Sequence, residues 1–251
     1  MTGWVKIVGL GPGSDGLVTP KAQDVLAEAT DVIGYIPYVK RIAPRDGLTL
    51  HASDNRVELE RARLALTLAS QGQRVAVVSS GDPGVFAMAS AVFEAVEEHP
   101  DTWANLDIDV LPGITAMLAA SARAGAPLGH DFCAINLSDN LKPYDLIEKR
   151  IRLSVEADFA MGFYNPRSKS RPTGFERVLQ ILKETCQDRR PLIFARAVST
   201  PQEELKIVAL PDARSDMADM RTVVLVGSSQ TRLIERASGR PFVYTPRSVL
   251  A

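Results

Sequence analysis

The first half of the chain alternates short apolar runs with longer segments whose apolar residues recur at helical spacing. The short runs are rich in β-branched residues, and they predict buried strands at residues 5–10, 31–35, 74–79 and 108–111. The longer segments predict helices from Thr19-Pro20 to about residue 29 and at residues 58–71, 85–97 and 115–124. This alternation favours a parallel sheet covered by helices on both faces.

The second half resumes the alternation after a run of glycine, alanine and proline at residues 125–129, the best candidate for a linker. Strands are predicted at residues 132–137, 159–164, 192–197, 205–209 and 223–226. Helices are predicted at residues 144–155 and 174–185. A linker there would divide the chain into residues 1–126 and residues 127–251, although the length also suits one large domain.

Composition and charge narrow the choice of partners. The 251 residues carry 29 Lys and Arg against 30 Asp and Glu, so no basic excess supports a nucleic-acid partner. The two cysteines, Cys133 and Cys186, do not indicate a disulfide framework. No apolar run reaches the ~18 residues of a membrane helix, and no secretory signal opens the chain. We expect a cytoplasmic protein with no membrane partner.

Three loops follow the predicted strands of the first half, with the sequences GLGPG at 9–13, SGDPGVF at 80–86 and PGITA at 112–116. Ligands of parallel sheets collect at the carboxyl ends of the strands, so the loops are expected to converge on one crevice. Two purely structural alternatives stay open. Asp82 could cap a helix that starts at Pro83, and Thr115 could cap the helix after it.

Together with three later segments, these loops resemble the tetrapyrrole (precorrin) methyltransferases. The later segments are FYNPRS at 163–168, RA at 196–197 and MRTVVLVG at 220–227. The resemblance runs from residue 5 to about residue 230. It implies an α/β fold of two αβα lobes, with a mostly parallel sheet in the first and a mixed sheet in the second. The cofactor, S-adenosylmethionine, would lie in the cleft between the lobes and leave as S-adenosylhomocysteine.

Three segments are similar to the members that methylate precorrin-3B at C-17 and contract the ring to precorrin-4 in cobalamin biosynthesis. They are GYIPY at 34–38, GVFAMA at 84–89 and YNPRS at 164–168. A sirohaem-type relative would show Gly-Gly-Asp-Pro in the second motif and Tyr-Met at 164–165, and this sequence departs from both. Other tetrapyrrole acceptors stay open, among them cobalt-factor III at C-17 and precorrin-4 at C-11. The family is usually homodimeric, so a homodimer is expected.

The resemblance also implies roles for individual residues. Contacts to the cofactor are expected from Pro12, Ser80, Gly81, Asp82, Val85, Thr115, Ala116, Tyr164, Asn165, Ala197, Thr222 and Val223. For the four that are Val or Ala, a core role is the alternative. Substrate contacts are expected from Gly11, Arg167, Lys169 and Arg171. Arginine suits carboxylate recognition, although a solvated loop is the alternative for the three basic residues.

Methyl transfer from a sulfonium to a nucleophilic carbon needs mainly positioning, which can supply ~7–11 kcal/mol of the barrier. No protein-bound metal is expected, and the scattered His51, His99 and His130 are interpreted as structural or surface residues. Ring contraction also requires proton transfers. The candidate acids and bases are Asp82, Tyr35, Tyr38 and Ser168.

Two rival functions can be distinguished by the residues or the binding that each would require. A nicotinamide-dependent oxidoreductase would use the loop at 9–13, but Pro12 removes a main-chain N–H there and the next helix starts only near Pro20. It would also place an acid at the end of the second strand, whereas Asp31 lies at its beginning. A catalytically silent tetrapyrrole-binding module is the third reading, and cofactor binding would test it.

Overall fold

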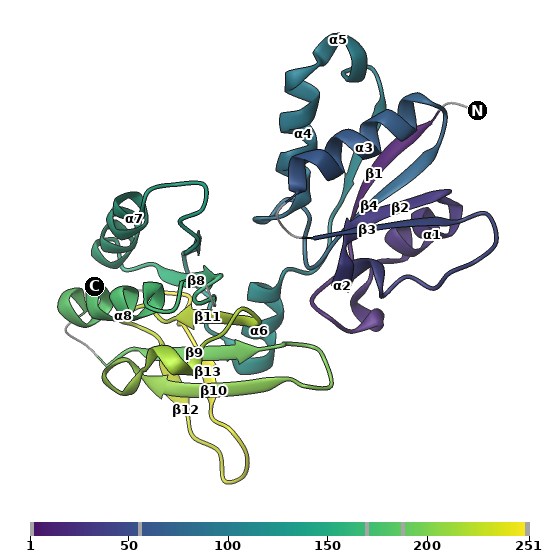
Figure 1. The fold of residues 1–251 in the computed structure, drawn as a ribbon. Coiled ribbons are helices and arrows are strands. Elements are labelled where there is room, and N and C mark those ends of the chain that lie inside the picture. The colour runs from purple at the N-terminus through teal and green to yellow at the C-terminus, as the bar shows by residue number, and fades with distance from the viewer. Residues whose placement is uncertain (1–2, 55–56, 169–170, 187–188, 249–251) are drawn as a thin grey trace. The chain divides into compact units, whose positions relative to one another are not determined.

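The computed structural model describes residues 3–54, 57–168, 171–186 and 189–248 (Figure 1). The chain divides into two compact units, Met1–Thr115 and Ala116–Ala251. Each unit has its own sheet and its own apolar core, as the alternation of strands and helices predicts.

The sheet of the first unit is parallel throughout. Its strands lie in the order β3-β2-β4-β1-β5. Their bounds are β1 Trp4–Gly9, β2 Asp31–Tyr35, β3 Thr49–Ser53, β4 Arg74–Ser79 and β5 Asp107–Leu111. The expected strands are confirmed, and β3 is an edge strand that the sequence pattern missed. Every strand ends at the same edge of the sheet, which brings the loops after β1, β4 and β5 together.

Helices cover both faces of this sheet (Figure 1). α3 (Glu58–Ser70), α4 (Met88–Glu98) and the short α5 (Pro100–Trp103) pack on one face, whereas α1 (Pro20–Glu28) and α2 (Ile36–Val39) pack on the other. The alternation of side chains along each strand explains the two cores. In β4, for example, Val75 and Val77 face α3, while Ala76 and Val78 belong to the opposite cluster.

Of two predicted helix starts, the structure confirms one and shifts the other. Thr19 caps α1 as predicted, since its Oγ1 accepts a hydrogen bond from the Ala22 N–H at 3.3 Å. The helix predicted from residue 85 begins instead at Met88. Phe86 has a φ of 54°, in the left-handed region, and Ala87 is extended, so the backbone turns before it can become helical.

The second unit contains a mixed sheet in the order β10-β9-β11-β8-β7. Only β7 and β8 are parallel, and the other pairs are antiparallel. The bounds are β7 Phe132–Asn136, β8 Ala160–Tyr164, β9 Pro191–Arg196, β10 Glu204–Ala209 and β11 Thr222–Val226. All five strands were predicted to within two residues at each end, and the mixed sheet implied by the resemblance is confirmed.

Three α-helices belong to the described part of this unit. α7 (Tyr144–Glu156) and α8 (Gly174–Thr185) cover one face of the mixed sheet, and α6 (Ala116–Ala124) contacts β11. A side chain at Gly162 of β8 would collide with Met117 of α6, so glycine permits close packing there. The expected division after residue 126 assigns α6 to the first domain, whereas the compact units divide before it, because α6 packs on the second sheet.

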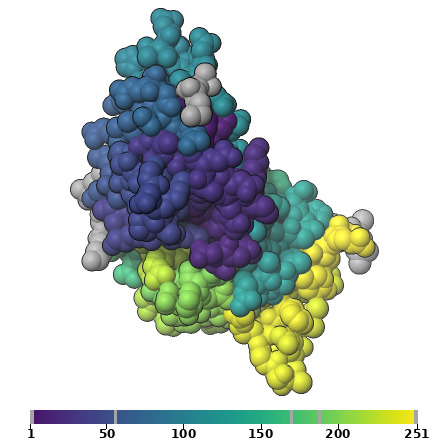
Figure 2. Space-filling view, turned by 90° about the vertical axis from the view of Figure 1, so that its right-hand side faces the viewer, coloured from purple at the N-terminus to yellow at the C-terminus, as the bar shows by residue number. Residues whose placement is uncertain are grey.

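The predicted linker at residues 125–129 contains a strand. β6 (Gly125–Ala126) pairs with β13 (Phe242–Tyr244), which pairs in turn with β12 (Arg232–Ile234). A side chain at Gly125 would come within 2.5 Å of the Val243 carbonyl oxygen, so the glycine reflects close strand pairing and not a flexible joint. Residues 232–240 are exposed, and the yellow C-terminal segment stands out from the green surface of this unit (Figure 2).

Candidate functional site

The loops after β1 and β4 are joined directly at the carboxyl edge of the first sheet. The Gly11 N–H donates to the Gly81 carbonyl at 3.2 Å, and the Gly81 N–H donates to the Gly11 carbonyl at 2.8 Å. Both glycines have a φ of 65°, a conformation that other residues rarely adopt. The strand ends beside them, Gly9 and Ser79, are register partners.

Asp82 links the same loops to the third one. Its Oδ2 accepts a hydrogen bond from the Gly113 N–H at 3.0 Å, and its Oδ1 accepts one from the Gly84 N–H at 2.8 Å. The alternative that Asp82 caps a helix starting at Pro83 is wrong, because α4 begins only at Met88. The carboxylate therefore organises two loops of the site.

The three loops approach so closely that a side chain would not fit at their contact. A Cβ on Gly9 would lie 2.7 Å from the Gly81 carbonyl oxygen and 2.8 Å from the Gly113 Cα. The sequence prediction that residues 9–13, 80–86 and 112–116 converge is thus confirmed for the loop segments at Gly9–Gly11, Gly81–Asp82 and Gly113.

Tyr35 and Tyr38 lie at the end of β2 and in α2, at the same edge of the sheet. Their rings meet edge to face, with centroids 5.3 Å apart. Burial, and then the neighbouring Tyr35, raise the pKa of Tyr38, and the charges of Arg61 and Arg41 oppose this shift. A Tyr38 hydroxyl that stays protonated at neutral pH can donate a hydrogen bond.

In the second unit, one edge of the mixed sheet collects the predicted residues. Arg196 and Thr222 are register partners in β9 and β11, and β8 pairs Phe163 with Val224. The edge therefore carries the ends of β8 and β9 and the start of β11. These positions hold Tyr164, Asn165, Ala197, Thr222 and Val223.

Tyr164 and Asn165 hold neighbouring segments in place. The Met117 N–H donates to the Tyr164 hydroxyl at 3.0 Å, which connects the start of α6 to the end of β8. The Asn165 side-chain amide donates to Oδ1 of Asn136 at 3.1 Å. The same Asn136 oxygen accepts from the Ser138 N–H at 2.9 Å, so the loops after β7 and β8 are fastened together.

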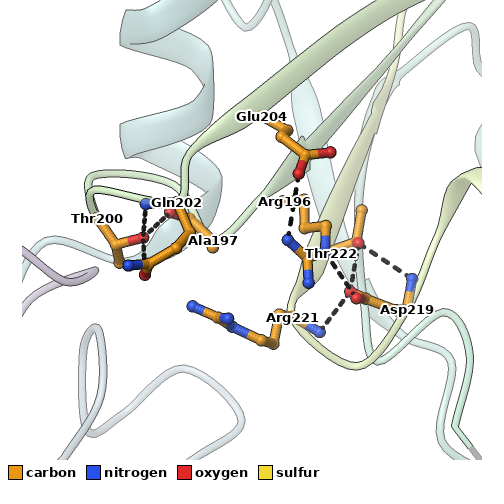
Figure 3. A network of polar contacts seen from close by, with 8 residues as sticks. All are labelled: Arg196, Ala197, Thr200, Gln202, Glu204, Asp219, Arg221 and Thr222. Atoms are coloured by element: carbon orange, nitrogen blue, oxygen red, sulfur yellow. Dashed lines mark hydrogen bonds and ion pairs between the residues drawn. The ribbon is translucent and has the colours of Figure 1, made fainter.

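Asp219 is the centre of a polar network around Thr222, shown in Figure 3. It accepts hydrogen bonds from Arg196 Nε at 2.7 Å, from Thr222 Oγ1 at 2.8 Å and from the Arg221 N–H at 2.9 Å. Burial alone would raise the pKa of Asp219, but these hydrogen bonds and the Arg196 charge lower it overall. Sequence reasoning missed Asp219, although its place just before the motif at 220–227 was an available signal.

The loop after β9 has a constrained backbone. Ala197 and Ser199 have φ values of 47° and 63°. The Ala197 N–H donates to the Arg221 carbonyl at 2.8 Å, and its own carbonyl accepts from Thr200 Oγ1 at 2.8 Å (Figure 3). Both Ala197 and Val223 are buried, which agrees with the core alternative for these two residues.

The basic loop after β8 is only partly described, because Lys169 lies outside the described residues. Arg167 Nε donates to the Pro172 carbonyl at 3.2 Å. Arg171 Nη1 lies within hydrogen-bond distance of the carbonyls of Leu137 and Asn165, at 3.3 and 3.4 Å. Ser168 and Arg171 exchange main-chain hydrogen bonds. Arg171 Nη1 therefore helps to shape its own loop, whereas its buried Nε has no hydrogen-bond partner among the described residues and lies 3.6 Å from Asp139 Oδ1.

The backbone strain in these loops fits a ligand site. Across the described ranges, five non-glycine residues have positive φ: Phe86, Asp158, Asn165, Ala197 and Ser199. Four of them follow β4, β8 or β9 at the two edges described above. Left-handed backbone at such residues costs energy and clusters at ligand sites. Main-chain donors and acceptors fixed in this way fit a cofactor such as S-adenosylmethionine.

In the part of the chain that the structure describes, no group of three or more His, Cys, Asp or Glu residues is placed to hold a metal ion. No described helix is long and apolar enough to span a bilayer. His51 contacts Asp31 at 2.8 Å and His99 packs edge to face on Trp103, so both have structural contacts, as predicted.

The fold and the loop geometry are those of a methyltransferase built from two αβα units. Residues 5–214 match the family described as Tetrapyrrole (Corrin/Porphyrin) Methylases, and the chain belongs to this family. A precorrin-3B C(17)-methyltransferase from Sinorhizobium sp is 48% identical over 247 residues, which cover 98% of this chain and 97% of that protein.

Other relatives agree with this assignment. A probable cobalt-factor III C(17)-methyltransferase from Salmonella typhimurium is 36% identical over 250 residues, covering 96% of this chain and 99% of that protein. The crystal structure of the methyltransferase CobJ aligns with a TM-score of 0.93 at 65% identity, covering 97% of this chain and all of that one. A uroporphyrin-III C-methyl transferase from Thermus thermophilus, complexed with S-adenosyl homocysteine, shares the fold with a TM-score of 0.68 at 23% identity and coverage of 90% and 92%.

Proposed function

We propose that this chain methylates precorrin-3B at C-17, using S-adenosylmethionine, and contracts the macrocycle to give precorrin-4 in cobalamin biosynthesis. The observation that carries the proposal is the joining of the loops at 9–13, 80–84 and 112–114 through Gly11, Gly81 and Asp82. The similarity to the precorrin-3B enzyme over nearly the full length of both chains supports the choice of substrate.

Bound S-adenosylmethionine supplies a methyl carbon activated by its positive sulfur. The residues of this chain then act by holding two reactants in one geometry. In the first unit, Pro12, Ser80, Gly81 and Val85 offer a cradle whose shape Asp82 maintains through Gly113. Thr115, Ala116 and the β8, β9 and β11 positions of the second unit complete the proposed contact set. Placement of the cofactor in a cleft between the units stays a prediction.

Proton transfers during ring contraction require a group at the same edge as the cofactor loops. Tyr38 supports this role because its hydroxyl is protonated at neutral pH, burial raises its pKa further, and Tyr35 packs against its ring. Asp82 is a weaker candidate than the sequence suggested, since both of its oxygens accept main-chain hydrogen bonds. Ser168 is engaged in the turn with Arg171.

A second candidate function is methylation of cobalt-factor III at the same carbon. It is favoured by the relative from Salmonella typhimurium, which matches at lower identity over a similar length. Purified chain given labelled S-adenosylmethionine and either macrocycle distinguishes the two. Mass spectrometry should find one added methyl group, and NMR should locate it at C-17. Transfer to cobalt-factor III but not to precorrin-3B would favour the second candidate.

We also propose a cytoplasmic homodimer. Apolar side chains on the outer faces of α4 and α6 support self-association, since Phe93 is 50% exposed and Leu118 is 48% exposed. Light scattering coupled to size exclusion should give twice the chain mass. A monomer at all concentrations would contradict this part of the proposal without affecting the assigned chemistry.

A further inference from the structure

Arg61 is a buried cation at the edge of the first sheet. Only 3% of this α3 residue is exposed. Its guanidinium donates to Ser53 Oγ at 3.0 Å, to the Asp54 carbonyl at 2.6 Å and to Met88 Sδ at 3.2 Å. Within the described part of the chain, no carboxylate forms an ion pair with it. By contrast, the buried Arg190 of the second unit has Asp158 at 3.4 Å.

An uncompensated buried charge is costly, and proteins retain one mainly where an anion arrives or a structural role requires it. Burial lowers the pKa of Arg61, and the charges of Glu58, Tyr38 and Asp54 oppose this shift. The position of Arg61 is informative, because Ser53 ends β3 and Met88 begins the helix after the loop at 80–86. The positive charge therefore lies at the ligand edge of the sheet.

Arg41 is a second cation at the same edge, and it is accessible. It follows α2, and 22% of its side chain is exposed. Its Nη2 donates to the Leu10 carbonyl at 2.9 Å, which anchors it to the first glycine loop. Its Nε and Nη1 make no hydrogen bond to any described residue. Its nearest acid, Asp15, is 3.5 Å away and 92% exposed, so that contact is weak.

Tyr38 lies at the same edge, in α2 and three residues before Arg41. The charges of both guanidiniums act on its hydroxyl and oppose the effect of burial on its pKa. Tyr35, the register partner of Ser53, packs against the Tyr38 ring. The end of β2 and α2 thus carry two phenols at the same edge as one partly exposed guanidinium, Arg41, and one buried guanidinium, Arg61.

We propose that Arg41 and Arg61 form a subsite for a peripheral carboxylate of the tetrapyrrole substrate. Arg41 binds the carboxylate through its free N–H groups, and the buried charge of Arg61 strengthens the same positive potential. Binding there sets the ring beside Tyr35 and Tyr38. This subsite rests on the proposed function, and it differs from the basic loop at residues 167–171, which belongs to the second unit.

The test is steady-state kinetics on the full chain with precorrin-3B varied at saturating S-adenosylmethionine. Arg41→Gln should raise KM for precorrin-3B by about tenfold or more, because a hydrogen bond to a charged group contributes about 1.5–3 kcal/mol. The Kd of S-adenosylhomocysteine, measured by calorimetry, should stay within about twofold. Arg41→Lys should give an intermediate KM, since lysine keeps the charge but loses the planar fork.

Arg45→Gln is the matched control. Arg45 lies in the same unit and donates to the carbonyls of Leu26, Ala27 and Ala29 at the end of α1, away from the glycine loops. It should leave KM for precorrin-3B unchanged. Arg61→Lys should retain most substrate affinity and Arg61→Met should lose it. If Arg61→Met fails to fold, the Arg41 variants still decide the proposal.

Two results would overturn the subsite. One is a KM for Arg41→Gln within about twofold of the wild-type value. The other is an equal loss of S-adenosylhomocysteine affinity, which would assign the carboxylate to the cofactor or the effect to a disturbed glycine loop. If the wild-type chain makes no product from precorrin-3B, the proposed function fails first. Binding of uroporphyrin III to wild type and Arg41→Gln, followed by fluorescence quenching, then tests the subsite alone.

Discussion

The Asp82 carboxylate accepts a hydrogen bond from the main-chain N–H of Gly113 at 3.0 Å, which joins two loops that are 31 residues apart in sequence. Its other oxygen accepts the Gly84 N–H, so one side chain sets the shape of the loop after β4 and its distance from the loop after β5. A side chain that organises a cofactor loop should affect cofactor affinity before it affects folding.

Asp82→Asn should therefore weaken S-adenosylhomocysteine binding by about tenfold, because an amide offers one acceptor in place of two charged ones. Isothermal calorimetry measures this change. Asp109→Asn removes an exposed carboxylate from the same unit and should leave the Kd unchanged. Equal affinities for wild type and Asp82→Asn would mean that the bridge has no role in binding.

Gly113→Ala should destabilise the chain by about 1–3 kcal/mol, because the added Cβ collides with the Gly81 carbonyl oxygen. The urea midpoint of unfolding reports the change. Gly174→Ala is the control: the α8 position has open space around its hypothetical Cβ, so that variant should unfold no earlier than wild type. If both variants unfold alike, the close approach of the loops is not what requires glycine at position 113.

Asp219 makes part of the stability dependent on pH. Its pKa is lower in the folded chain than the usual value of about 3.9, so its contribution is complete above that value. The contribution is lost as pH falls through the folded pKa. The amount should be below about 1 kcal/mol, because the carboxylate is 45% exposed.

The pH-dependent contribution of Asp219 can be checked by urea midpoints of unfolding, measured from pH 5 down to the lowest pH at which the chain is folded. Asp219→Asn should flatten the profile below about pH 4. Asp216→Asn, which removes a neighbouring carboxylate that is 65% exposed, should keep the wild-type profile. An unchanged slope in Asp219→Asn would show that the network in Figure 3 does not stabilise the folded carboxylate.

Much of the architecture was predictable because the hydrophobic periodicity of strands and helices is a property of the local sequence. β2 was predicted to the residue, and Thr19 with Pro20 marked the start of α1. The strands missed by pattern were β3, β6, β12 and β13, which lie at sheet edges or in the small third sheet. Such strands have weak alternation because they bury little side-chain surface. Gly125 resembled a linker because its role depends on Val243, a distant partner.

The site was predictable as a set of loops and less so as a set of contacts. The glycines showed where the backbone turns, but the partner of Asp82 is Gly113, which no local pattern indicates. Arg41 and Arg61 were missed for a similar reason. In the sequence, Arg41 is an ordinary polar residue after a short helix and Arg61 is one within a helix. Their significance comes from contacts that only the fold creates, with Leu10 for Arg41 and with Ser53 and Met88 for Arg61.

The phenols beside those arginines give the last prediction. Replacing both Tyr35 and Tyr38 with Phe keeps the edge-to-face packing and removes only the hydroxyl groups. If Tyr38 donates a proton or hydrogen bond during ring contraction, turnover should fall by roughly 10²-fold, the lower limit for positioned acid catalysis. The Kd of S-adenosylhomocysteine should not change, because neither ring is a proposed cofactor contact. Methyl transfer should persist when ring contraction fails, so NMR would detect a methylated, uncontracted product. Wild-type kinetics would remove both tyrosines from the mechanism.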